Sequence, residues 1–381
     1  MKKLIALAVA ASTLAISGHV YAGPLSNLHS SNVAPMVVAG NPNDPVNPDS
    51  PGDRVDPNVA SSPFAGVVSI YIQYEDGGYI CTGAMIDKWH VATAAHCVDE
   101  TDTGVAIDLT NPNNNLSIQL NNDGSYRDDR AGSIISARNA TIHPDYEGFG
   151  ICPDGSFGCV NDDIALIELS KPVGDDIPIY EFLDRPVMAN DQFVMVGYGT
   201  SGDAVDGYYV SPDFDVKRVG ANVVDLFETD DEGDFVFGPD NSEGLAEVWY
   251  ADFDGDRDSD GVVTGDEDAH CFYYGICSEQ LPNANDWDNM VWGEANIGGG
   301  DSGGPSFIYD EATGEYLLAA NNTFGIPIYD GAGGDIFGGI VYGAYSDWIN
   351  NYLNTTKVPA PAPLALLGLG LVGLMLKRRK A

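Results

Sequence analysis

Basic residues are scarce in this chain. Among 381 residues there are 17 lysines and arginines against 57 aspartates and glutamates, which gives a formal net charge of −40. A surface with this charge repels nucleic acids and anionic membranes and attracts cations. We therefore expect no nucleic-acid partner, and we interpret the composition as that of a secreted protein adapted to salt or divalent ions.

Long apolar runs are also missing at the two ends of the chain. The apolar runs at residues 4–16 and 364–376 are shorter than the roughly 20 residues that a membrane-spanning helix needs. A basic start precedes the first run, and Val20-Tyr21-Ala22 follows it as a small-residue cleavage site. Residues 1–22 are therefore predicted to be a signal peptide, and the protein is predicted to be exported.

Cysteine is sparse, with six residues in the chain. Six cysteines allow 15 connectivities, but these six fall into three pairs that are close in sequence. In an exported protein we expect each pair to form a local disulfide. The predicted bridges are Cys81–Cys97, Cys152–Cys159 and Cys271–Cys277.

Segments with helical periodicity are few. From residue 63 onward, short runs rich in β-branched and aromatic residues recur between turn clusters, and no helical segments alternate with them. This pattern predicts an all-β sandwich or a pair of barrels. Residues 344–353 have helical spacing, and we expect a short C-terminal helix there. The clearest expected strands are 66–74, 116–120, 134–142, 164–169, 193–198, 216–227, 245–250 and 316–324.

Three short motifs carry the chemistry. Ser302 lies in Gly-Asp-Ser-Gly-Gly-Pro, where backbone N–H groups can surround a reacting carbonyl. A serine hydroxyl needs a base to take its proton and a third group to orient that base. His96 in Thr-Ala-Ala-His-Cys and Asp163 in Asp-Ile-Ala-Leu supply both. The order His, Asp, Ser along the chain is one of three known orders for such triads.

Together, TAAHC, DIAL and GDSGGP resemble the motifs of the trypsin-like (chymotrypsin family) serine peptidases, over roughly residues 55–353. The resemblance implies an all-β fold of two six-stranded antiparallel β-barrels with the active site in the cleft between them. It also implies a serine endopeptidase that hydrolyses protein or peptide substrates through an acyl-enzyme without a cofactor. His96 and Asp163 would come from the first barrel and Ser302 from the second.

Other site residues follow from the same resemblance. The backbone N–H groups of Gly300 and Ser302 would form the oxyanion hole. Asn296 takes the position at the base of the primary specificity pocket, where an acid would select lysine or arginine. Thr323 and Gly325 take positions in the substrate-pairing strand. The neutral amide of Asn296 favours a neutral P1 side chain in the substrate.

The cysteine pattern follows the family only in part. A bridge that matches Cys81–Cys97 is known in the family and would hold the loop of His96. The family's cysteine four residues before the serine is absent, because Gly298 stands there. We therefore expect the floor of the specificity pocket to be held in another way.

Residues 23–54 are polar and rich in proline, asparagine and aspartate, which predicts a flexible leader or a propeptide. In the family that the chain resembles, a freed N-terminal ammonium pairs with the aspartate before the nucleophile, here Asp301, and organises the oxyanion hole. We expect a zymogen that is cut after Arg54, so that Val55 forms this ion pair. Val37-Val38-Ala39-Gly40, which resembles the family's mature start, is the alternative.

An acidic insertion at residues 252–268 resembles a calcium loop. Its acids, central glycine and final glutamate fit the twelve-residue EF-hand pattern, which offers the hard oxygen ligands that Ca²⁺ prefers. We expect a structural ion that protects the loop from autolysis, and the alternative is a solvated acidic loop. The predicted ligands are Asp256, Asp258, Asp260, Glu267 and the carbonyl of Val262.

The C-terminal segment 358–381 combines a proline-containing motif, a short apolar run and a basic end. It resembles the PEP-CTERM sorting signal of Gram-negative bacteria, which implies processing by an exosortase-type system. The alternative is a permanent single-helix anchor, and in both cases the basic end stays cytoplasmic. We therefore expect an extracellular or surface protein that this segment anchors transiently in the inner membrane.

Two other functions are consistent with these residues. A catalytically silent, calcium-stiffened surface module would bind matrix or protein partners on the same fold. An esterase would use the same triad, because both reactions are acyl transfers. The intact triad favours the endopeptidase over the silent module.

Overall fold

The structure is a computed structural model that describes several stretches of the chain. Residues 1–36, the predicted calcium ligands between residues 256 and 267, and the sorting segment 358–381 lie outside the described residues. Within the described part, no helix is long and apolar enough to cross a membrane. The chain divides into two compact units, Met1–Ala344 and Tyr345–Ala381. The described stretches are 37–75, 77–124, 134–156, 158–231, 237–255, 268–278, 280–326 and 332–356.

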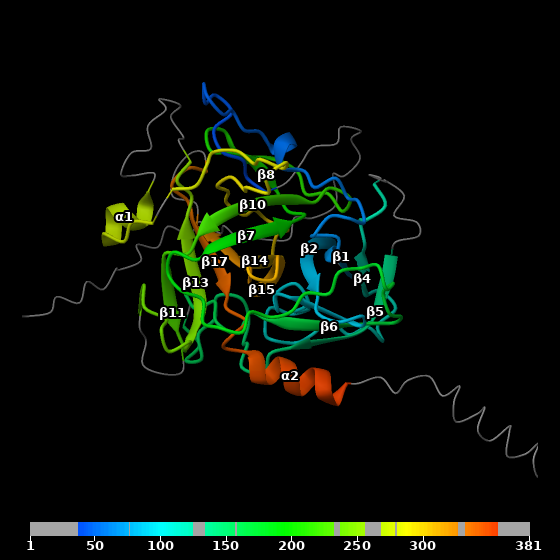
Figure 1. Ribbon diagram of the computed structural model, residues 1–381. Coiled ribbons are helices and arrows are strands. Elements are labelled where there is room, and N and C mark those ends of the chain that lie inside the picture. The colour runs from blue at the N-terminus through cyan, green and yellow to red at the C-terminus, as the bar shows by residue number, and fades with distance from the viewer. Residues whose placement is uncertain are drawn as a thin grey trace, which may run out of the picture. The chain divides into compact units, whose positions relative to one another are not determined.

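The first six strands close into an antiparallel barrel (Figure 1). They are β1 (Val67–Tyr74), β2 (Gly77–Met85), β3 (His90–Thr93), β4 (Asn115–Gln119), β5 (Ile134–Ile142) and β6 (Ala165–Leu169). Their order around the barrel is β1-β2-β3-β6-β5-β4. Successive side chains of a strand point to opposite faces, so Val68, Ile70 and Ile72 of β1 all enter the core.

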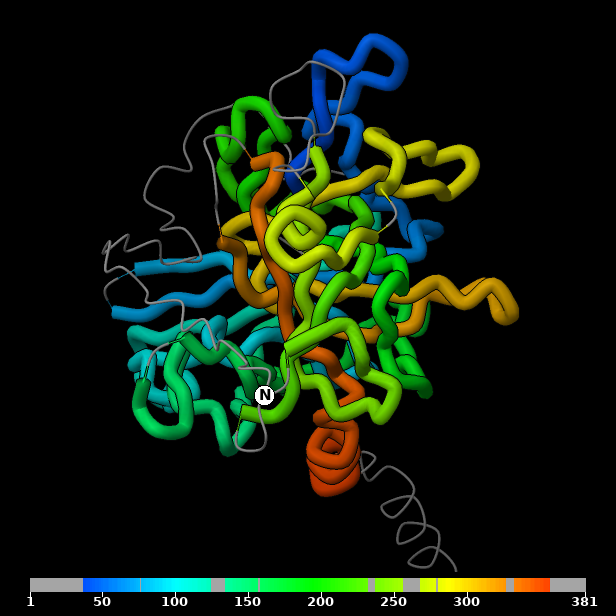
Figure 2. The backbone as a smooth tube through the Cα atoms, turned by 90° about the vertical axis from the view of Figure 1, so that its left-hand side faces the viewer, coloured from blue at the N-terminus to red at the C-terminus, as the bar shows by residue number. Residues whose placement is uncertain are grey.

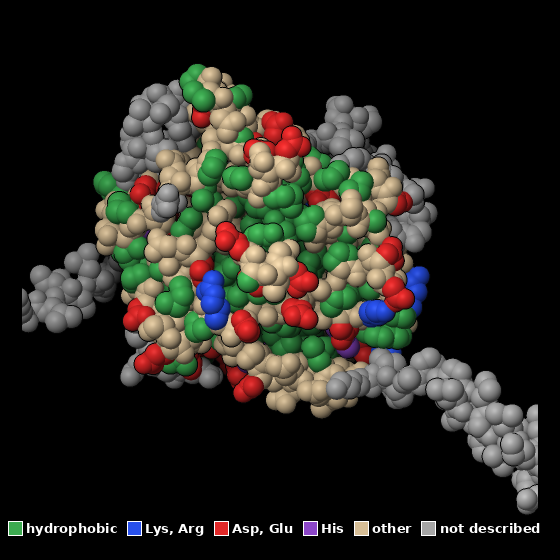
Figure 3. Space-filling model, in the orientation of Figure 1, with side chains coloured by type: hydrophobic (Ala, Val, Ile, Leu, Met, Phe, Trp, Pro, Cys, Tyr) green, Lys and Arg blue, Asp and Glu red, His purple; other side chains and the backbone are tan. Residues whose placement is uncertain are grey.

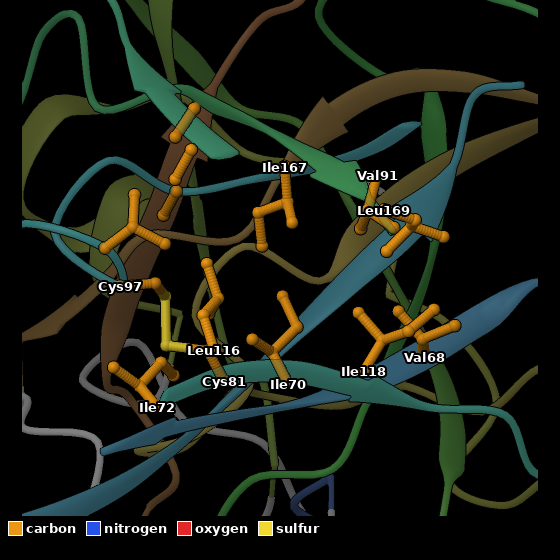
Figure 4. Close-up of a cluster of buried hydrophobic side chains, with 14 of the residues drawn as sticks. Val68, Ile70, Ile72, Cys81, Val91, Cys97, Leu116, Ile118, Ile167 and Leu169 are labelled. Carbon is orange, nitrogen blue, oxygen red and sulfur yellow. A yellow bond between two sulfur atoms is a disulfide. The ribbon is translucent and has the colours of Figure 1, made fainter. Parts of the chain in front are cut away.

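The core of this barrel is apolar and includes a disulfide. Figure 4 shows isoleucine, leucine and valine side chains of several strands gathered near the Cys81–Cys97 bridge. Burial of such side chains contributes about 25 cal/mol per Å² of apolar area removed from water. Because Cys97 directly follows His96, the bridge connects the histidine to the most stable part of the barrel.

The second half of the chain forms two further sheets and a hairpin. Their strands are β7 (Gln192–Gly197), β8 (Ser201–Asp203), β9 (Gly207–Val210), β10 (Arg218–Val223), β11 (Leu226–Thr229), β12 (Phe237–Gly238), β13 (Ala246–Asp252), β14 (Pro305–Asp310), β15 (Glu315–Asn321), β16 (Phe324–Ile326) and β17 (Ile336–Ile340). One sheet has the order β10-β7-β14-β15, and the other has the order β12-β11-β13-β17-β16. The strands β8 and β9 pair with each other.

The predicted all-β, double-barrel architecture is confirmed, with one difference in the second half. Its strands pair as two sheets, which are linked by a bridge between Ala320 and Val341. The expected strand 216–227 is divided, because β10 pairs with β7 whereas β11 pairs with β13. The chain changes sheets at the buried residues Val224 and Asp225.

Aromatic side chains join the two sheets of the second half. Trp249 of β13 meets Phe193 of β7 and Phe337 of β17 edge to face, with ring centroids 4.9 and 5.8 Å apart. Its indole N–H donates to the carbonyl of Asn321 at 3.0 Å. The end of β15 is therefore fixed from within the core.

The described residues include two α-helices, α1 (Ala269–Tyr274) and α2 (Ser346–Thr355), and the short 3-10 helix η2 (Pro51–Arg54). The helix α2 confirms the predicted C-terminal helix. The helix α1 was not predicted, and it is too short to be stable alone. Asp268 caps it by accepting the Cys271 N–H at 2.9 Å, Gly275 ends it with φ of 68°, and the Cys271–Cys277 bridge closes it. All three predicted disulfides are present.

Residues 37–55 lie along the stretch 280–295, as Figures 1 and 2 show in blue and yellow. The Asn41 N–H donates to the Asn283 side chain at 2.6 Å. The Arg54 guanidinium donates to three backbone carbonyls of the same stretch at 2.7 to 2.8 Å. The N-terminal part of the described chain is thus built into the second half of the fold.

Positive charge is even scarcer on the surface than in the composition. Figure 3 shows many acidic and few basic side chains on one face. Three basic side chains, Arg54, Lys217 and Arg218, are fully buried. Because these three side chains lie in the interior, acidic groups outnumber basic ones among the exposed charged side chains.

Candidate active site

Hydrogen bonds fix the nucleophile loop to the first barrel. Thr82 of β2 donates its N–H to the Ser302 carbonyl and its hydroxyl to the Gly300 carbonyl, both at 2.9 Å. Gly303 has φ of 75°, and a Cβ there would lie 2.0 Å from the Thr93 hydroxyl. Glycine alone fits such an approach. The glycines of this motif therefore let the loop reach the barrel that carries the histidine.

His96 and Asp163 form a close pair. The Asp163 carboxylate accepts from His96 Nδ1 at 2.6 Å and from the His96 backbone N–H at 2.8 Å. The exposed fraction is 9% for the His96 side chain and 0% for that of Asp163. The Phe149 ring packs on the imidazole with 4.9 Å between centroids. This arrangement favours the Nδ1–H tautomer, which leaves Nε2 as the base.

The neighbouring aspartate has another partner. Asp162 Oδ1 lies 3.0 Å from Nδ1 of His143, and its backbone has φ of 60°. This left-handed turn points the two consecutive carboxylates to different histidines. The structure therefore pairs His96 with Asp163, as the motif predicted, and not with Asp162.

Ser302 lies beside His96 without a hydrogen bond to it. Cys97 Sγ is 3.6 Å from the Ser302 carbonyl oxygen and 3.9 Å from His96 Nε2. Ser302 is 2% exposed, and its Oγ has no hydrogen-bond partner among the described residues. Buried hydroxyls without partners are uncommon and call for a functional explanation. Catalytic hydrogen bonds often tighten only when substrate binds.

The backbone N–H groups of Gly300 and Ser302 have no hydrogen-bond partner in the described chain, whereas the carbonyls of the residues before them do. The Gly299 carbonyl accepts from the Thr200 N–H at 2.8 Å, and the Asp301 carbonyl accepts a backbone N–H three residues further on at 2.8 Å. In a trans peptide the N–H points opposite to the carbonyl. The N–H groups of Gly300 and Ser302 are therefore turned away from these partners, and neither donates a hydrogen bond within the described chain.

Asp301 is buried under two glycines. Its carboxylate accepts from the N–H of Gly199 at 2.7 Å and from that of Gly298 at 2.8 Å. A Cβ at Gly197 or Gly199 would lie 2.0 or 2.3 Å from Asp301 atoms, which explains the Gly-Tyr-Gly sequence there. Burial raises the pKa of Asp301 to about 6, although these hydrogen bonds and the charge of Arg218 lower it.

The structure does not bring Val55 to Asp301. Val55 forms a backbone bridge with Arg218. The Arg54 side chain is 0% exposed, and its guanidinium binds the Asp49 carboxylate as well as three carbonyls. The Arg54 side chain is therefore buried in the described structure, and cleavage after it stays a prediction.

The alternative start, Val37, lies in the region of Asp301. Ser201 donates its hydroxyl to the Val37 carbonyl, and Ser201 is two residues after the glycine whose N–H binds Asp301. Val38 donates its N–H to the Asn296 carbonyl at 3.3 Å. Val37 is 1% exposed and has φ of 67°, which is unfavourable for a β-branched residue.

The predicted pocket residues differ in accessibility. Asn296 is 0% exposed, and its amide donates to the Tyr208 hydroxyl at 2.9 Å. Thr323 is buried and donates its hydroxyl to the Asn321 side chain at 2.9 Å. A Cβ on Gly325 would meet no atom within 4 Å. Gly325 thus faces open space, whereas Asn296 is buried and donates one of its amide N–H groups to Tyr208.

Asn321 is a site residue that the sequence analysis missed. Its side-chain amide donates to the Asp163 carbonyl at 3.1 Å, and its side-chain oxygen accepts from Thr323 and from the Ile340 N–H. It therefore connects Asp163, beside the first barrel, to β15 and β17 of the second half. No motif marks this residue, because its partners are distant in sequence.

A second buried histidine has similar partners. His270 Nδ1 lies 2.8 Å from Asp225 Oδ2 and 3.3 Å from Asp252 Oδ1. Burial alone would lower the pKa of His270, but hydrogen bonds and charges from the two carboxylates outweigh burial and raise the pKa to about 9. These three residues could hold a metal ion. The sulfur atoms beside His96 could not, because they form a disulfide.

A cavity of about 970 Å³ lies away from the three motif residues His96, Asp163 and Ser302. It is lined by residues such as Ile179, Met290, Trp292 and Tyr309, and by no triad residue. This cavity therefore does not coincide with the residues that the motifs predicted for the active site.

A comparison with known proteins finds a match for the part of the chain that contains the barrel strands. The family model described as Trypsin matches residues 57–213. This stretch is therefore similar to a trypsin-like serine protease domain, and it includes His96 and Asp163 but ends before Ser302. The match and the closed barrel agree, and both point to the fold of a trypsin-like serine protease domain in this stretch. No curated protein matches the chain.

Proposed function

We propose that this protein is an exported serine endopeptidase that uses Ser302, His96 and Asp163. One observation carries the proposal. The unpartnered, buried hydroxyl of Ser302 lies beside a histidine that a fully buried aspartate holds at two points. No other arrangement of these groups is as well suited to acyl transfer.

The reaction follows from the positions of the groups. Ser302 Oγ attacks the scissile carbonyl carbon while His96 Nε2 takes the hydroxyl proton. The N–H groups of Gly300 and Ser302 bind the resulting oxyanion, each contributing about 3 to 4 kcal/mol. The C–N bond then breaks, and His96 gives its proton to the leaving amine. Water, deprotonated by His96, releases the acid product from Ser302, while Asp163 stabilises the imidazolium throughout.

Covalent labelling tests the proposal. A fluorophosphonate probe should label the exported, processed protein, and Ser302→Ala should not be labelled. Ser306→Ala is the matched control, because Ser306 is a buried serine of the adjacent strand whose hydroxyl is bonded to Asn322 at 2.7 Å. Failure of correctly processed wild-type protein to label would favour the silent binding module. Ester hydrolysis without amide hydrolysis would favour the esterase.

We also propose that the protein is made as a zymogen and that its mature chain begins at Val37. The new ammonium would pair with Asp301, whose carboxylate lies near the Val37 segment. This would relieve the unfavourable φ of Val37, since an N-terminal residue has no preceding carbonyl to constrain it. N-terminal sequencing of active protein should give Val37. A start at Gly23 or Val55 would contradict this cleavage.

The open space at Gly325 and the neutral Asn296 support a preference for neutral P1 side chains. A peptide library should show cleavage after uncharged residues. Cleavage strictly after lysine or arginine would overturn this preference.

We also propose that the protein is exported and sorted, and that its acidic loop binds calcium. Residues 1–22 would direct export, and residues 358–381 would be removed by sorting machinery or would stay as an anchor. Mass spectrometry of surface protein distinguishes these outcomes. A calcium ion held by the loop at 256–267 should give calorimetric uptake that Glu267→Gln removes.

A further inference from the structure

A cavity of about 250 Å³ lies where three segments of the chain meet, at residues 40–44, 253–255 and 280–294. No lysine or arginine lines it. Its polar lining consists of carboxylates and amides. The side chains concerned are Asp44, Asp254, Glu294, Asn41, Gln280 and Asn283.

Asp254 is the central observation in this cavity. It is 6% exposed, and its Oδ1 atom has no hydrogen-bond partner among the described residues. Its backbone groups are satisfied, because its N–H donates to Glu294 Oε1 at 2.6 Å and its carbonyl accepts from Gln280 at 2.9 Å. A buried carboxylate without a partner is costly, so this carboxylate requires a ligand or a proton.

Glu294 places a second carboxylate beside it. Glu294 is 5% exposed, and its other oxygen, Oε2, accepts from the Leu281 N–H at 2.9 Å. Backbone N–H groups satisfy one lone pair of each oxygen and supply no full positive charge. The two acids therefore form a buried pair of like charges.

The surrounding charges do not compensate this pair. Asp225 and Asp252 also face it, and His270 is already held between those two carboxylates. The nearest arginine, Arg54, contacts the Glu294 backbone carbonyl, but its guanidinium is paired with Asp49. In the described part of the chain, no lysine or arginine side chain forms an ion pair with Asp254 or Glu294.

We propose that this cavity is a divalent-cation site of the calcium type, with Asp254 and Glu294 as its charged ligands. Ca²⁺ takes six to eight hard oxygen ligands in flexible geometry. Amide oxygens of the lining, Asp44 at the mouth and water would complete the shell. The absence of cysteine and histidine from the lining argues against zinc.

The position of this cation site indicates a different role from that of the predicted calcium loop at 256–267. Asn41 binds Asn283 across the cavity, and Val38, three residues earlier, donates its N–H to the Asn296 carbonyl. Glu294 is two residues before Asn296. A bound cation would therefore hold the N-terminal segment against the stretch that leads to the nucleophile, independently of whether the enzyme is active.

Calcium titration of the full exported chain, read by calorimetry, tests the site. Asp254→Asn should weaken the binding of one ion at least tenfold, and Glu267→Gln in the acidic loop should leave this ion bound. Asp288→Asn is the matched control, because it removes an exposed acid from the same 280–294 segment outside the cavity. Unchanged binding in Asp254→Asn would overturn the proposal, and so would a single ion that both Asp254→Asn and Glu267→Gln abolish.

Thermal unfolding gives a second measurement that needs no activity. Calcium should raise the Tm of the wild type and leave that of Asp254→Asn unchanged. Without metal, Asp254→Asn should be at least as stable as the wild type, because it replaces a buried carboxyl group that has an unpartnered oxygen. If Asp254→Asn does not fold, Asp44→Asn replaces it and should weaken binding severalfold. A wild type that takes up no calcium and gains no Tm would exclude the site.

Discussion

Two of the histidine–aspartate arrangements in the described part of the chain, those of His96 and His270, are alike in most respects. His96 and His270 are each followed by a disulfide-bonded cysteine. Each donates its backbone N–H to a carboxylate at 2.8 Å, and each has a carboxylate oxygen within 2.8 Å of Nδ1. By local geometry alone, either histidine could serve as the oriented base of a triad.

The difference lies in what surrounds each histidine. His96 has one carboxylate partner and lies next to the Ser302 loop, whereas His270 is 1% exposed between two carboxylates. Two buried carboxylates hold a histidine protonated, and a protonated imidazole cannot act as a base. The comparison teaches that a histidine–aspartate pair becomes catalytic only when one carboxylate orients it and a nucleophile loop meets its free nitrogen.

The most direct test of the difference between the two histidines is to make the same aspartate-to-asparagine substitution in both arrangements. Asp163→Asn should lower kcat by about 10⁴-fold, because the amide favours the wrong imidazole tautomer. Asp225→Asn should leave kcat within a few fold and lower the free energy of unfolding by about 1 to 3 kcal/mol, because it removes a charged partner of His270. Kinetics on a peptide substrate and urea unfolding measure the two effects. A large loss of kcat in Asp225→Asn would show that the two arrangements are coupled.

The second test uses pH. The pKa of His270 is raised to about 9, from about 6.5 in an unfolded chain. A group whose pKa is raised on folding stabilises the fold below the unfolded pKa, and this stabilisation is lost as the pH rises through the folded value. Stability should therefore fall by about 3 kcal/mol between pH 6.5 and 9.5 because of this residue.

Urea unfolding of wild type and His270→Gln at both pH values measures this contribution. The variant should show a smaller decrease with pH than the wild type. Equal decreases in the two proteins would mean that His270 does not carry the extra proton.

The third test compares the two disulfides beside the histidines. Cys81–Cys97 spans 16 residues and Cys271–Cys277 spans 6. Loop-closure entropy predicts losses of about 3 and about 2 kcal/mol when each bridge is replaced by two alanines. Loss of the first bridge should also reduce kcat, because it frees the loop of His96, whereas loss of the second should not. Denaturant unfolding and kinetics of the two double variants measure these losses. A larger loss of stability or of kcat without Cys271–Cys277 than without Cys81–Cys97 would refute the prediction.

The smallest expected effect on kcat is that of Asn321, whose side chain binds the carbonyl of Asp163, the partner of His96. Asn321→Ala should lower kcat about tenfold with little change in KM, because a small shift of the Asp163 backbone misorients the base. Asn322→Ala is the control, since Asn322 bonds Ser306 and has no bond to Asp163. Equal kinetic effects of both variants would indicate a general loss of packing rather than positioning.

Patterns within short stretches of sequence predicted the structure better than any relation between residues far apart in the chain. The motifs around His96, Asp163 and Ser302 were sufficient to predict residues that the fold brings together, because each lies in a short sequence with a distinctive composition. Strands with clear alternation, such as β1 and β5, were also predicted closely. In contrast, β2 was missed because its glycines weaken the strand signal, and β14 was missed because it begins with Pro305.

The remaining differences come from contacts that no local pattern encodes. Arg54 looked like an exposed cleavage site by its chemistry, but Asp49 and distant carbonyls bury it. Asn321 and the Asp254–Glu294 pair acquire their roles from partners on other segments. Burial and long-range pairing, rather than residue type, determine what these side chains do.

The hydrogen bond from Thr82 to the Ser302 carbonyl has a practical consequence. It joins two parts of the chain that are separated by the connection between β6 and β7, and the base and the nucleophile lie on opposite sides of that connection. Opening the chain between Leu169 and Gln192 would yield two fragments, neither with a complete triad. Fused to two interacting proteins, these fragments would form a split-enzyme reporter if the protein has the activity that we propose, with a signal only on association.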